Sequence, residues 1–229
     1  MTTLTLHYHP LSSYCQKVLI AIDILGVDVN KRLLNLGGPA EREAFLTLWP
    51  TGKMPLLVDK GRPIPETSII IEHLQRHHAR GGQMLIPDAT DAAIDVRLWD
   101  RLFDLYVMTP MQAFTADLLK REDERDANSA ARAREVLLTA YATIDRQLEG
   151  RTWITGDLFT MADCAAAPAL FYAVTYVPLP AQHARLSPYF ERLMDHPSVK
   201  ATIENARPWF KFYPGRAGLA RRFFDPASA

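Results

Sequence analysis

Short apolar runs alternate with longer amphipathic ones over residues 1–80. Leu4–Tyr8 alternates with a period of two and predicts a strand, and Asp28–Leu34 predicts a second one. Between them, Lys17–Leu25 is almost continuously apolar, with serines before it and Gly26 after it. Serine favours the start of a helix and glycine its end, so this run predicts a buried helix.

A second helix and a hairpin follow. Ala40–Leu48 predicts a polar helix, and Leu56–Asp59 and Pro63–Ile64 flank the turn signal Lys60-Gly61, which predicts a hairpin. Glu66–His78 then carries apolar residues at helical spacing. The order βαβ-α-ββ-α predicts a small α/β domain, in which the first two strands pair in parallel and the hairpin adds antiparallel strands.

Residues 79–90 contain two glycines and a proline and are the best candidate for a linker. After them the strand signal disappears and apolar residues recur at helical spacing. These residues form two groups: Ile94, Leu98, Leu102, Leu105 and Tyr106, then Val136, Leu137, Ala140, Tyr141, Ile144 and Leu148. We therefore expect a first domain at 1–80, a linker at 81–90 and an all-helical domain at 91–229.

The helical part also carries a clear helix-start signal. Thr160 and Asp163 have the spacing of a capping box, with aspartate in place of the usual Glu or Gln. Cys164 follows in an apolar, alanine-rich run and is expected in the core. Two shorter helices are predicted at Pro188–Asp195 and Pro197–Ala206.

The composition narrows the possible partners. The 229 residues include 26 Lys+Arg and 26 Asp+Glu, so the formal net charge is zero. This argues against a general nucleic-acid binder, which needs a basic face, and against membrane binding by charge. No apolar run approaches the roughly 20 residues of a membrane span, and the N-terminus lacks the pattern of a signal peptide. The two cysteines are too few for a disulfide scaffold. We expect a cytoplasmic protein without nucleic-acid or membrane partners.

The segment Ser12-Ser13-Tyr14-Cys15 lies where the first strand turns into the first helix. A helix N-terminus presents backbone N–H groups and a partial positive charge, which stabilise a thiolate or another anion. The spacing is that of a C-x-x-C motif with Ser12 in place of the first cysteine, which removes dithiol exchange through this motif. The Ser12 hydroxyl can donate a hydrogen bond to a thiolate brought by a ligand, or a serine here can simply cap the helix.

Two further segments also have both a functional and a structural interpretation. Pro55 can be a cis proline that leaves the Met54 backbone to pair with an extended ligand, or an ordinary trans proline at the start of a strand. Glu66 and Thr67 precede an isoleucine-rich helix. They can cap this helix, or they can hold the ammonium and the carboxylate of an amino-acid-like ligand.

Taken together, these segments resemble the cytosolic glutathione transferase superfamily, in its serine type. The matching stretches are S-S-Y-C-Q-K-V at 12–18, G-K-M-P-L-L-V-D at 52–59, P-E-T-S-I-I-I-E-H-L at 65–74 and G-D-L-F-T-M-A-D at 156–163. The resemblance covers residues 4 to about 207. It implies a thioredoxin-like first domain that binds glutathione as cosubstrate. It also implies an all-α second domain that supplies a pocket for a small apolar electrophile, and a homodimer.

The resemblance also implies roles for single residues. Ser12 is the expected catalytic residue, which hydrogen-bonds the sulfur of glutathione and lowers its pKa, with Ser13 and Tyr14 as local alternatives. The residues expected to bind glutathione are Ser13, Arg42, Lys53, Met54, Pro55, Glu66 and Thr67. The residues expected to line the electrophile pocket are Tyr106, Met111 and Trp209.

Several other reactive side chains are ranked behind Ser12. Tyr8 lies on the first strand, where other classes of the family keep a catalytic tyrosine, but strand alternation points it away from its histidine neighbours. Cys15 lies one turn into the helix and is expected to be buried and inert. His73 and His77 form an i, i+4 pair without the glutamate of an H-E-x-x-H motif. We expect a solvated helix end there and no metal site.

The leading functional hypothesis is a glutathione transferase that conjugates glutathione to a small hydrophobic electrophile. A glutathione-dependent isomerisation or dehalogenation would share the thiolate step. A non-catalytic glutathione- or ligand-binding protein of the same fold is the alternative from another class. A reductase that uses the thiol of Cys15 is a further possibility.

Overall fold

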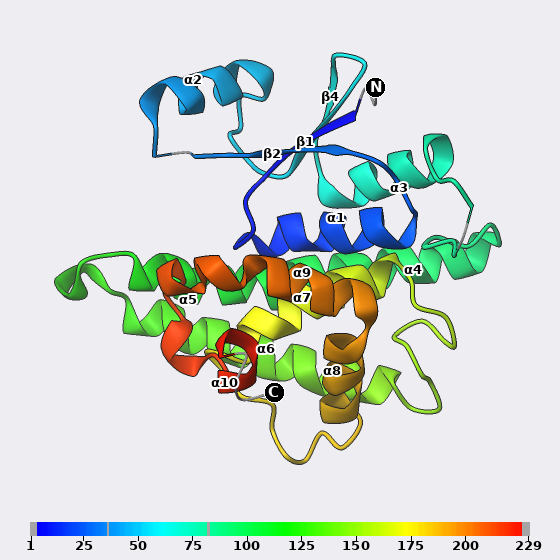
Figure 1. Ribbon diagram of the computed structural model, residues 1–229. Helices are drawn as coiled ribbons and strands as arrows, with labels where there is room; N and C mark the ends of the chain where they lie inside the picture. The colour runs from blue at the N-terminus through cyan, green and yellow to red at the C-terminus, as the bar shows by residue number, and fades with distance from the viewer. Residues whose placement is uncertain (1–3, 36, 82, 226–229) are drawn as a thin grey trace. The chain divides into compact units, whose positions relative to one another are not determined.

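The computed structural model describes residues 4–35, 37–81 and 83–225, shown in Figure 1. The chain separates by its internal contacts into two units, Met1–Ile86 and Pro87–Ala229. Strands occur in the first unit, and the described elements of the second unit are helical, apart from a single isolated bridge between Trp153 and Gly156.

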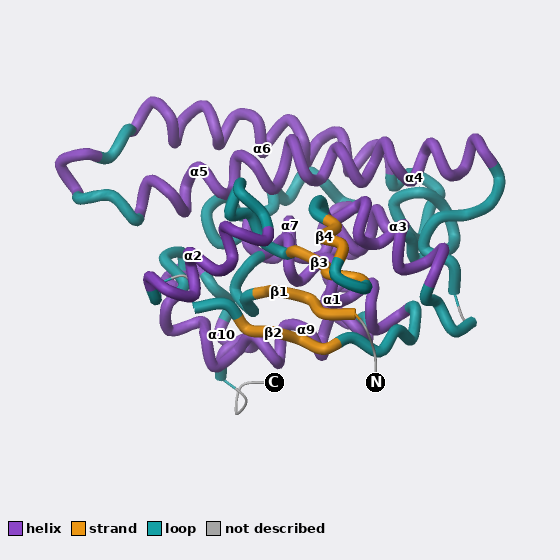
Figure 2. Tube along the Cα trace, turned by 90° about the horizontal axis from the view of Figure 1, so that it is seen from above, coloured by secondary structure: helices purple, strands orange, loops and turns teal. Residues whose placement is uncertain are grey.

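The first unit is built on a sheet of four strands: β1 (Leu4–Tyr8), β2 (Asn30–Leu33), β3 (Leu56–Asp59) and β4 (Arg62–Ile64). Their order across the sheet is β2-β1-β3-β4, which can be followed in Figure 2. β1 runs parallel to β2, while β3 is antiparallel to both β1 and β4. The predicted parallel pair and the predicted hairpin are therefore confirmed.

Three helices cover this sheet. α1 (Ser13–Ile24) and α3 (Thr67–His77) lie on one face and α2 (Pro39–Leu48) lies on the other, as Figure 1 shows. On the α2 face, Phe45 packs with Leu34 and Leu56 in a buried cluster. The order of elements and the mixed sheet give the thioredoxin-like arrangement that the sequence predicts.

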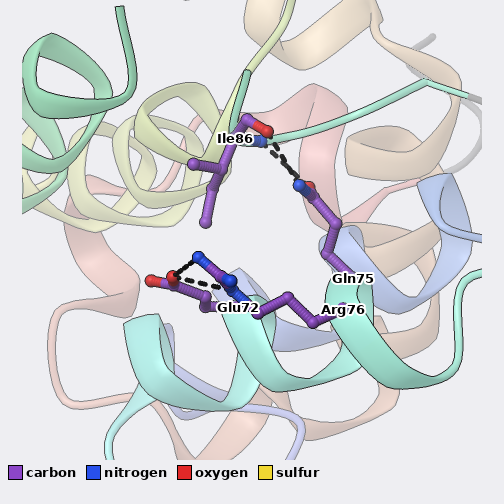
Figure 3. A network of polar contacts seen from close by, with 4 residues as sticks. All are labelled: Glu72, Gln75, Arg76 and Ile86. Atoms are coloured by element: carbon purple, nitrogen blue, oxygen red, sulfur yellow. Dashed lines mark hydrogen bonds and ion pairs between the residues drawn. The ribbon is translucent and has the colours of Figure 1, made fainter. Parts of the chain in front are cut away.

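A glutamine near the end of α3 holds the chain that leaves the first unit. The side-chain oxygen of Gln75 accepts hydrogen bonds from the backbone N–H groups of Leu85 (2.8 Å) and Ile86 (2.9 Å), and its nitrogen donates to the Ile86 carbonyl (2.7 Å). Figure 3 shows the contact between Gln75 and Ile86, together with the ion pair of Glu72 and Arg76, whose charged atoms lie 2.7 Å apart. Leu85 and Ile86 are also buried, so this part of the predicted linker is fixed to the first unit.

The second unit consists of helices joined by turns. Its α-helices are α4 (Thr90–Leu102), α5 (Thr109–Leu118), α6 (Ala127–Gln147), α7 (Met161–Ala173), α8 (Leu186–Asp195), α9 (Pro197–Ala206) and α10 (Arg221–Phe224). A π-helical segment, Phe103–Met108, joins α4 to α5 without a break. Within the described residues, no helix has the length and apolar character needed to cross a membrane.

Helix α7 is the centre of this unit, and every one of its residues is buried. The predicted capping box at its start is present, with Thr160 and Asp163 bonded to each other's backbone N–H groups. Cys164 is fully buried, as predicted. The aromatic tail beyond α9 packs back on this helix and on the turn that follows it. The Phe210 ring lies 5.8 Å from that of Phe171 on α7, and the Tyr213 hydroxyl lies 2.7 Å from the hydroxyl of Thr175, just beyond α7.

The apolar stripe predicted on the first long helix does not face the core. Ile94 and Leu98 are each 58% exposed, and Leu105 and Tyr106 are also exposed. The buried stripe is instead formed by Ala93, Val96, Trp99, Phe103 and Val107. The helical period was therefore predicted correctly, and the side chains that pack in the core belong to a second stripe of the same helix.

Candidate functional site

The sheet register gathers three predicted motifs at one end of the first unit. His7 pairs with Leu56, so the carboxyl end of β1 lies beside the amino end of β3. Leu57 pairs with Ile64, so β4 ends at that same edge. The segments that carry Ser12, Met54–Pro55 and Glu66 all adjoin this edge of the sheet.

Ser12 is the N-cap of α1. Its backbone N–H donates to the His9 carbonyl (3.0 Å), and its hydroxyl oxygen accepts from the backbone N–H of Cys15 (3.3 Å). The hydroxyl is therefore held at a helix N-terminus, where the partial positive charge favours an anion. Ser12 is half-buried, whereas Ser13 is only 4% exposed and its hydroxyl is less accessible to a ligand.

The two other reactive side chains near Ser12, Cys15 and Tyr8, both have a raised pKa. Cys15 is fully buried, as predicted. Burial raises the pKa of its thiol to about 12, although hydrogen bonds from the Ser12 side chain and the His9 backbone act in the opposite direction. Burial also raises the pKa of Tyr8, and the nearby Cys15 adds to this shift. A thiol with so high a pKa gives almost no thiolate near pH 7, which argues against a reductase that uses Cys15.

The Met54–Pro55 peptide bond is cis, as the resemblance implied. The Met54 side chain packs against the cluster of Leu34, Phe45 and Leu56 on the α2 face. A contact between Met54 and an extended ligand would therefore use its backbone. The basic residue before it, Lys53, is exposed, and so is Arg42 on α2.

Glu66 has the most unusual backbone conformation at this edge. Its φ of 68° and ψ of 122° fall in a region that favours glycine. Within the described residues, its side chain makes no capping hydrogen bond to α3, although it stands at the N-cap position. The carboxylate is exposed and Thr67, which begins α3, is 7% exposed. Capping therefore does not account for a glutamate at this position.

Lys17 is a buried residue of this region whose role the sequence analysis did not predict. It lies on α1 and is 0% exposed, and its ammonium donates to the hydroxyl of Ser68 (3.2 Å) in the first turn of α3. This contact ties the N-terminal part of the helix that holds Ser12 to the start of the helix that follows Glu66. The only signal in the sequence was a lysine at the start of an otherwise apolar helical run.

Both the first unit and the helical second unit match profiles of one known protein family. The family profile described as "Glutathione S-transferase, N-terminal domain" matches residues 6–82, and the one described as "Glutathione S-transferase, C-terminal domain" matches residues 127–197. The chain belongs to the glutathione transferase superfamily. The predicted family is thus confirmed over more than half of the sequence.

Individual glutathione transferases show how far the likeness extends. A glutathione S-transferase from Methylobacillus flagellatus KT, solved with GSH bound, is 25% identical with a TM-score of 0.78, over 87% of this chain and 98% of that one. One from Methylobacterium radiotolerans JCM 2831, in complex with glutathione sulfonate, is 26% identical with a TM-score of 0.75, over 87% and 93%. The glutathione S-transferase-like protein LUC7 from a Fusarium species is 25% identical over 165 residues, 70% of this chain and 73% of its own.

The residues predicted to line the electrophile pocket of this transferase lie in different environments of the second unit. Tyr106 is on the π-helical segment and is 54% exposed. Met111 on α5 is buried, and its sulfur lies 3.8 Å from the Thr115 hydroxyl. Trp209 is half-buried in the tail, 6.3 Å from the Phe212 ring between ring centres. A pocket formed by these side chains remains a prediction.

The predicted solvated end of α3 is wrong for two of its three histidines. His73 Nε2 lies 3.0 Å from Asp59 Oδ2, and His78 Nε2 lies 2.8 Å from the same oxygen. The side chains of His73 and His78 are only 18% and 21% exposed, because both contact Asp59 at the end of β3. Only His77 points into solvent as expected.

Proposed function

We propose that this chain is a glutathione transferase in which the Ser12 hydroxyl stabilises the thiolate of bound glutathione. The observation that carries the proposal is the position of Ser12 as the N-cap of α1, at the sheet edge that also holds the cis Met54–Pro55 bond and Glu66. The glutathione transferases with glutathione ligands described above, at 25% and 26% identity, support the glutathione-binding part of the proposal.

The hydroxyl and the helix act on the sulfur together. The Ser12 oxygen accepts the Cys15 N–H, which leaves its own proton to donate to a thiolate. A thiol of pKa about 8.5 is roughly 3% ionised at pH 7, and a pKa lowered to about 6.5 makes that fraction roughly 75%. The fraction of glutathione present as thiolate would therefore rise about 25-fold, and the rate of transfer to an electrophile would rise with it.

The other predicted residues would hold the peptide part of glutathione. The Met54 backbone, placed by Pro55, would pair with the cysteinyl unit. Glu66 and Thr67 would hold the γ-glutamyl end, since the Glu66 carboxylate is exposed and makes no capping bond in the described chain. Arg42 and Lys53 would contact the glycyl carboxylate. Ser13 would lie near the sulfur, next to Ser12. The electrophile would be a small apolar molecule in contact with Tyr106, Met111 and Trp209.

A paired substitution tests the serine mechanism. We expect Ser12→Ala to bind glutathione in calorimetry nearly as well as the parent, but to lose about 20-fold in turnover at pH 7 with a small apolar electrophile. The deficit should shrink as pH rises past the pKa of free glutathione, because the thiolate then forms unaided. Ser187→Ala, which removes an exposed serine hydroxyl on α8, is the matched control and should retain both binding and turnover. Equal turnover in Ser12→Ala and the parent at pH 7 would reject the mechanism.

The exposed apolar stripe supports a homodimer as the working form. Ile94, Leu98 and Leu105 are 47–58% exposed along one continuous helix, and a second copy of the same stripe is the self-complementary surface that would cover it. We expect Leu98→Arg to convert a dimer into a monomer in analytical ultracentrifugation. Leu158→Arg, at another exposed leucine that lies in the segment before α7, is the control for the added charge. A parent chain that sediments as a monomer would contradict the dimer.

A further inference from the structure

A cluster of two histidines and an aspartate lies at the opposite end of the sheet from Ser12. Asp59 ends β3 and pairs with Leu4, whereas His7, near the Ser12 end of β1, pairs with Leu56. His73 Nε2 and His78 Nε2 lie 3.0 and 2.8 Å from Asp59 Oδ2. These three atoms all lie within 4.8 Å of one another.

The fold explains why the three side chains meet. Along β3, Leu57 and Asp59 point to the same face by strand alternation, and that face is covered by α1 and α3. His73 lies in the last turns of α3, and His78 is its C-cap, with a backbone N–H that donates to the Leu74 carbonyl (2.9 Å). Each of the three groups is therefore held by a regular element and not by a free loop.

We propose that Asp59, His73 and His78 form a binding site for a divalent zinc ion. Two imidazole nitrogens and one carboxylate oxygen are a common ligand set for zinc, which leaves a fourth position for water. Ligand atoms about 2.0–2.1 Å from a tetrahedral zinc ion lie roughly 3.3 Å apart. The observed separations of 3.0 and 2.8 Å are close to this value, so a small outward movement of the imidazoles would admit the ion.

Charges of both signs lie near Asp59, His73 and His78. The C-terminal end of α3 carries the negative end of the helix dipole, which attracts positive charge. Lys60, which follows Asp59, and Arg62, which pairs with Asp59 in β4, oppose a cation, but both are exposed, so that solvent screens them. His77 is also exposed, and its ring centre is 4.7 Å from that of His73.

His77 supplies the matched control, because it is a neighbouring histidine outside the cluster. We expect calorimetric titration of zinc chloride into the full chain at pH 7.5 to show one ion per chain with a micromolar Kd. His73→Gln, His78→Gln and Asp59→Asn should each weaken binding at least 10-fold. His77→Gln should change the Kd by less than about twofold. The chain has seven histidines, so the contrast among these variants carries the result.

Unfolding provides an independent measurement. At a free zinc concentration 100 times the Kd, the unfolding equilibrium constant of the parent should fall about 100-fold, and that of the His73→Gln/His78→Gln double variant should not change. The double variant leaves Asp59 unchanged. It therefore still tests the site if Asp59→Asn does not fold. The proposal is overturned if the parent does not bind zinc at millimolar concentration. It is also overturned if the three cluster variants bind like the parent, or if His77→Gln loses as much affinity as they do.

Discussion

Asp163 stabilises the second unit through four hydrogen bonds to one carboxylate. Its Oδ1 accepts from the Ile154 N–H (3.1 Å) and the Tyr189 hydroxyl (2.7 Å). Its Oδ2 accepts from the N–H (2.9 Å) and the hydroxyl (3.0 Å) of Thr160. The residue is 0% exposed, so the donors around it have no access to water through its position. Replacing Asp163 with alanine should therefore destabilise the fold strongly.

The size of the loss follows from the donors that remain. Asp163→Ala leaves two backbone N–H groups without their acceptor, and each buried donor in that state costs about 1–3 kcal/mol. The two hydroxyls can rotate towards other acceptors and add less. Burial raises the pKa of Asp163 to about 6 despite its hydrogen bonds, so the charged form already bears a desolvation cost that the alanine variant recovers. The two donors together would cost about 2–6 kcal/mol. Because part of this is offset by the recovered desolvation, we expect a net loss of about 2–4 kcal/mol in the free energy of unfolding.

Urea unfolding measures this loss, with Trp153 as a local reporter. Its ring centre lies 4.9 Å from that of Phe159 and 6.4 Å from that of Tyr189, so its fluorescence follows the same region. Asp157→Ala, which removes an exposed carboxylate six residues earlier in the chain, should cost less than about 0.5 kcal/mol. A loss below about 1 kcal/mol for Asp163→Ala, or equal losses for both variants, would refute the reasoning.

Four further outcomes are expected. Lys17→Met should leave the melting temperature within a few degrees but weaken glutathione binding, because it removes the bond to Ser68 while filling the same space. Glu66→Gly should relieve the strain of its positive φ and raise stability by about 1 kcal/mol, yet reduce glutathione affinity more than 10-fold in calorimetry. Cys15→Ala should leave glutathione-dependent turnover within about twofold, and the native Cys15 thiol should react with thiol reagents only on unfolding. Burial lowers the pKa of His7, so below about pH 6.5 the unfolded state binds a proton that the folded state does not. The His7 contribution to stability should therefore fall as pH drops from 6.5 towards 5. In urea unfolding, the free energy of unfolding of His7→Gln should rise relative to that of the parent over this range.

The elements that the sequence predicts well are those with local signals. The strand Leu4–Tyr8 and the helix Pro197–Ala206 have the predicted bounds, because alternation and proline at a helix start are properties of neighbouring residues. The capping box at Thr160 is of the same kind. The edge that gathers Ser12, Pro55 and Glu66 was predictable only through the family resemblance, since these residues are far apart in the chain.

The missed features depend on contacts that no local pattern encodes. Asp59 and His73 are 14 residues apart, and they meet only because strand alternation and the placement of α3 bring them to one face. The spacing of Ile94 and Leu98 defines a helical stripe but not which stripe is buried, since the same helix presents a second apolar stripe that includes Trp99. Lys17 is buried on α1, where its ammonium donates to the hydroxyl of Ser68, a residue 51 positions later in the chain.

Helix α3 connects the two proposed sites and gives opposite electrostatic environments to them. Its 11 residues span about 16 Å, with Thr67 at the start and His77 at the end. The positive end of the dipole is beside Glu66 and suits the carboxylate of a ligand, while the negative end suits a cation near His78. Since the two sites share a helix but no side chain, each can fail without the other. Ser12→Ala should therefore leave zinc binding unchanged, and His73→Gln should leave the pKa of bound glutathione unchanged. A zinc-dependent change in that pKa would show instead that the ion acts on the thiolate through the position of α3.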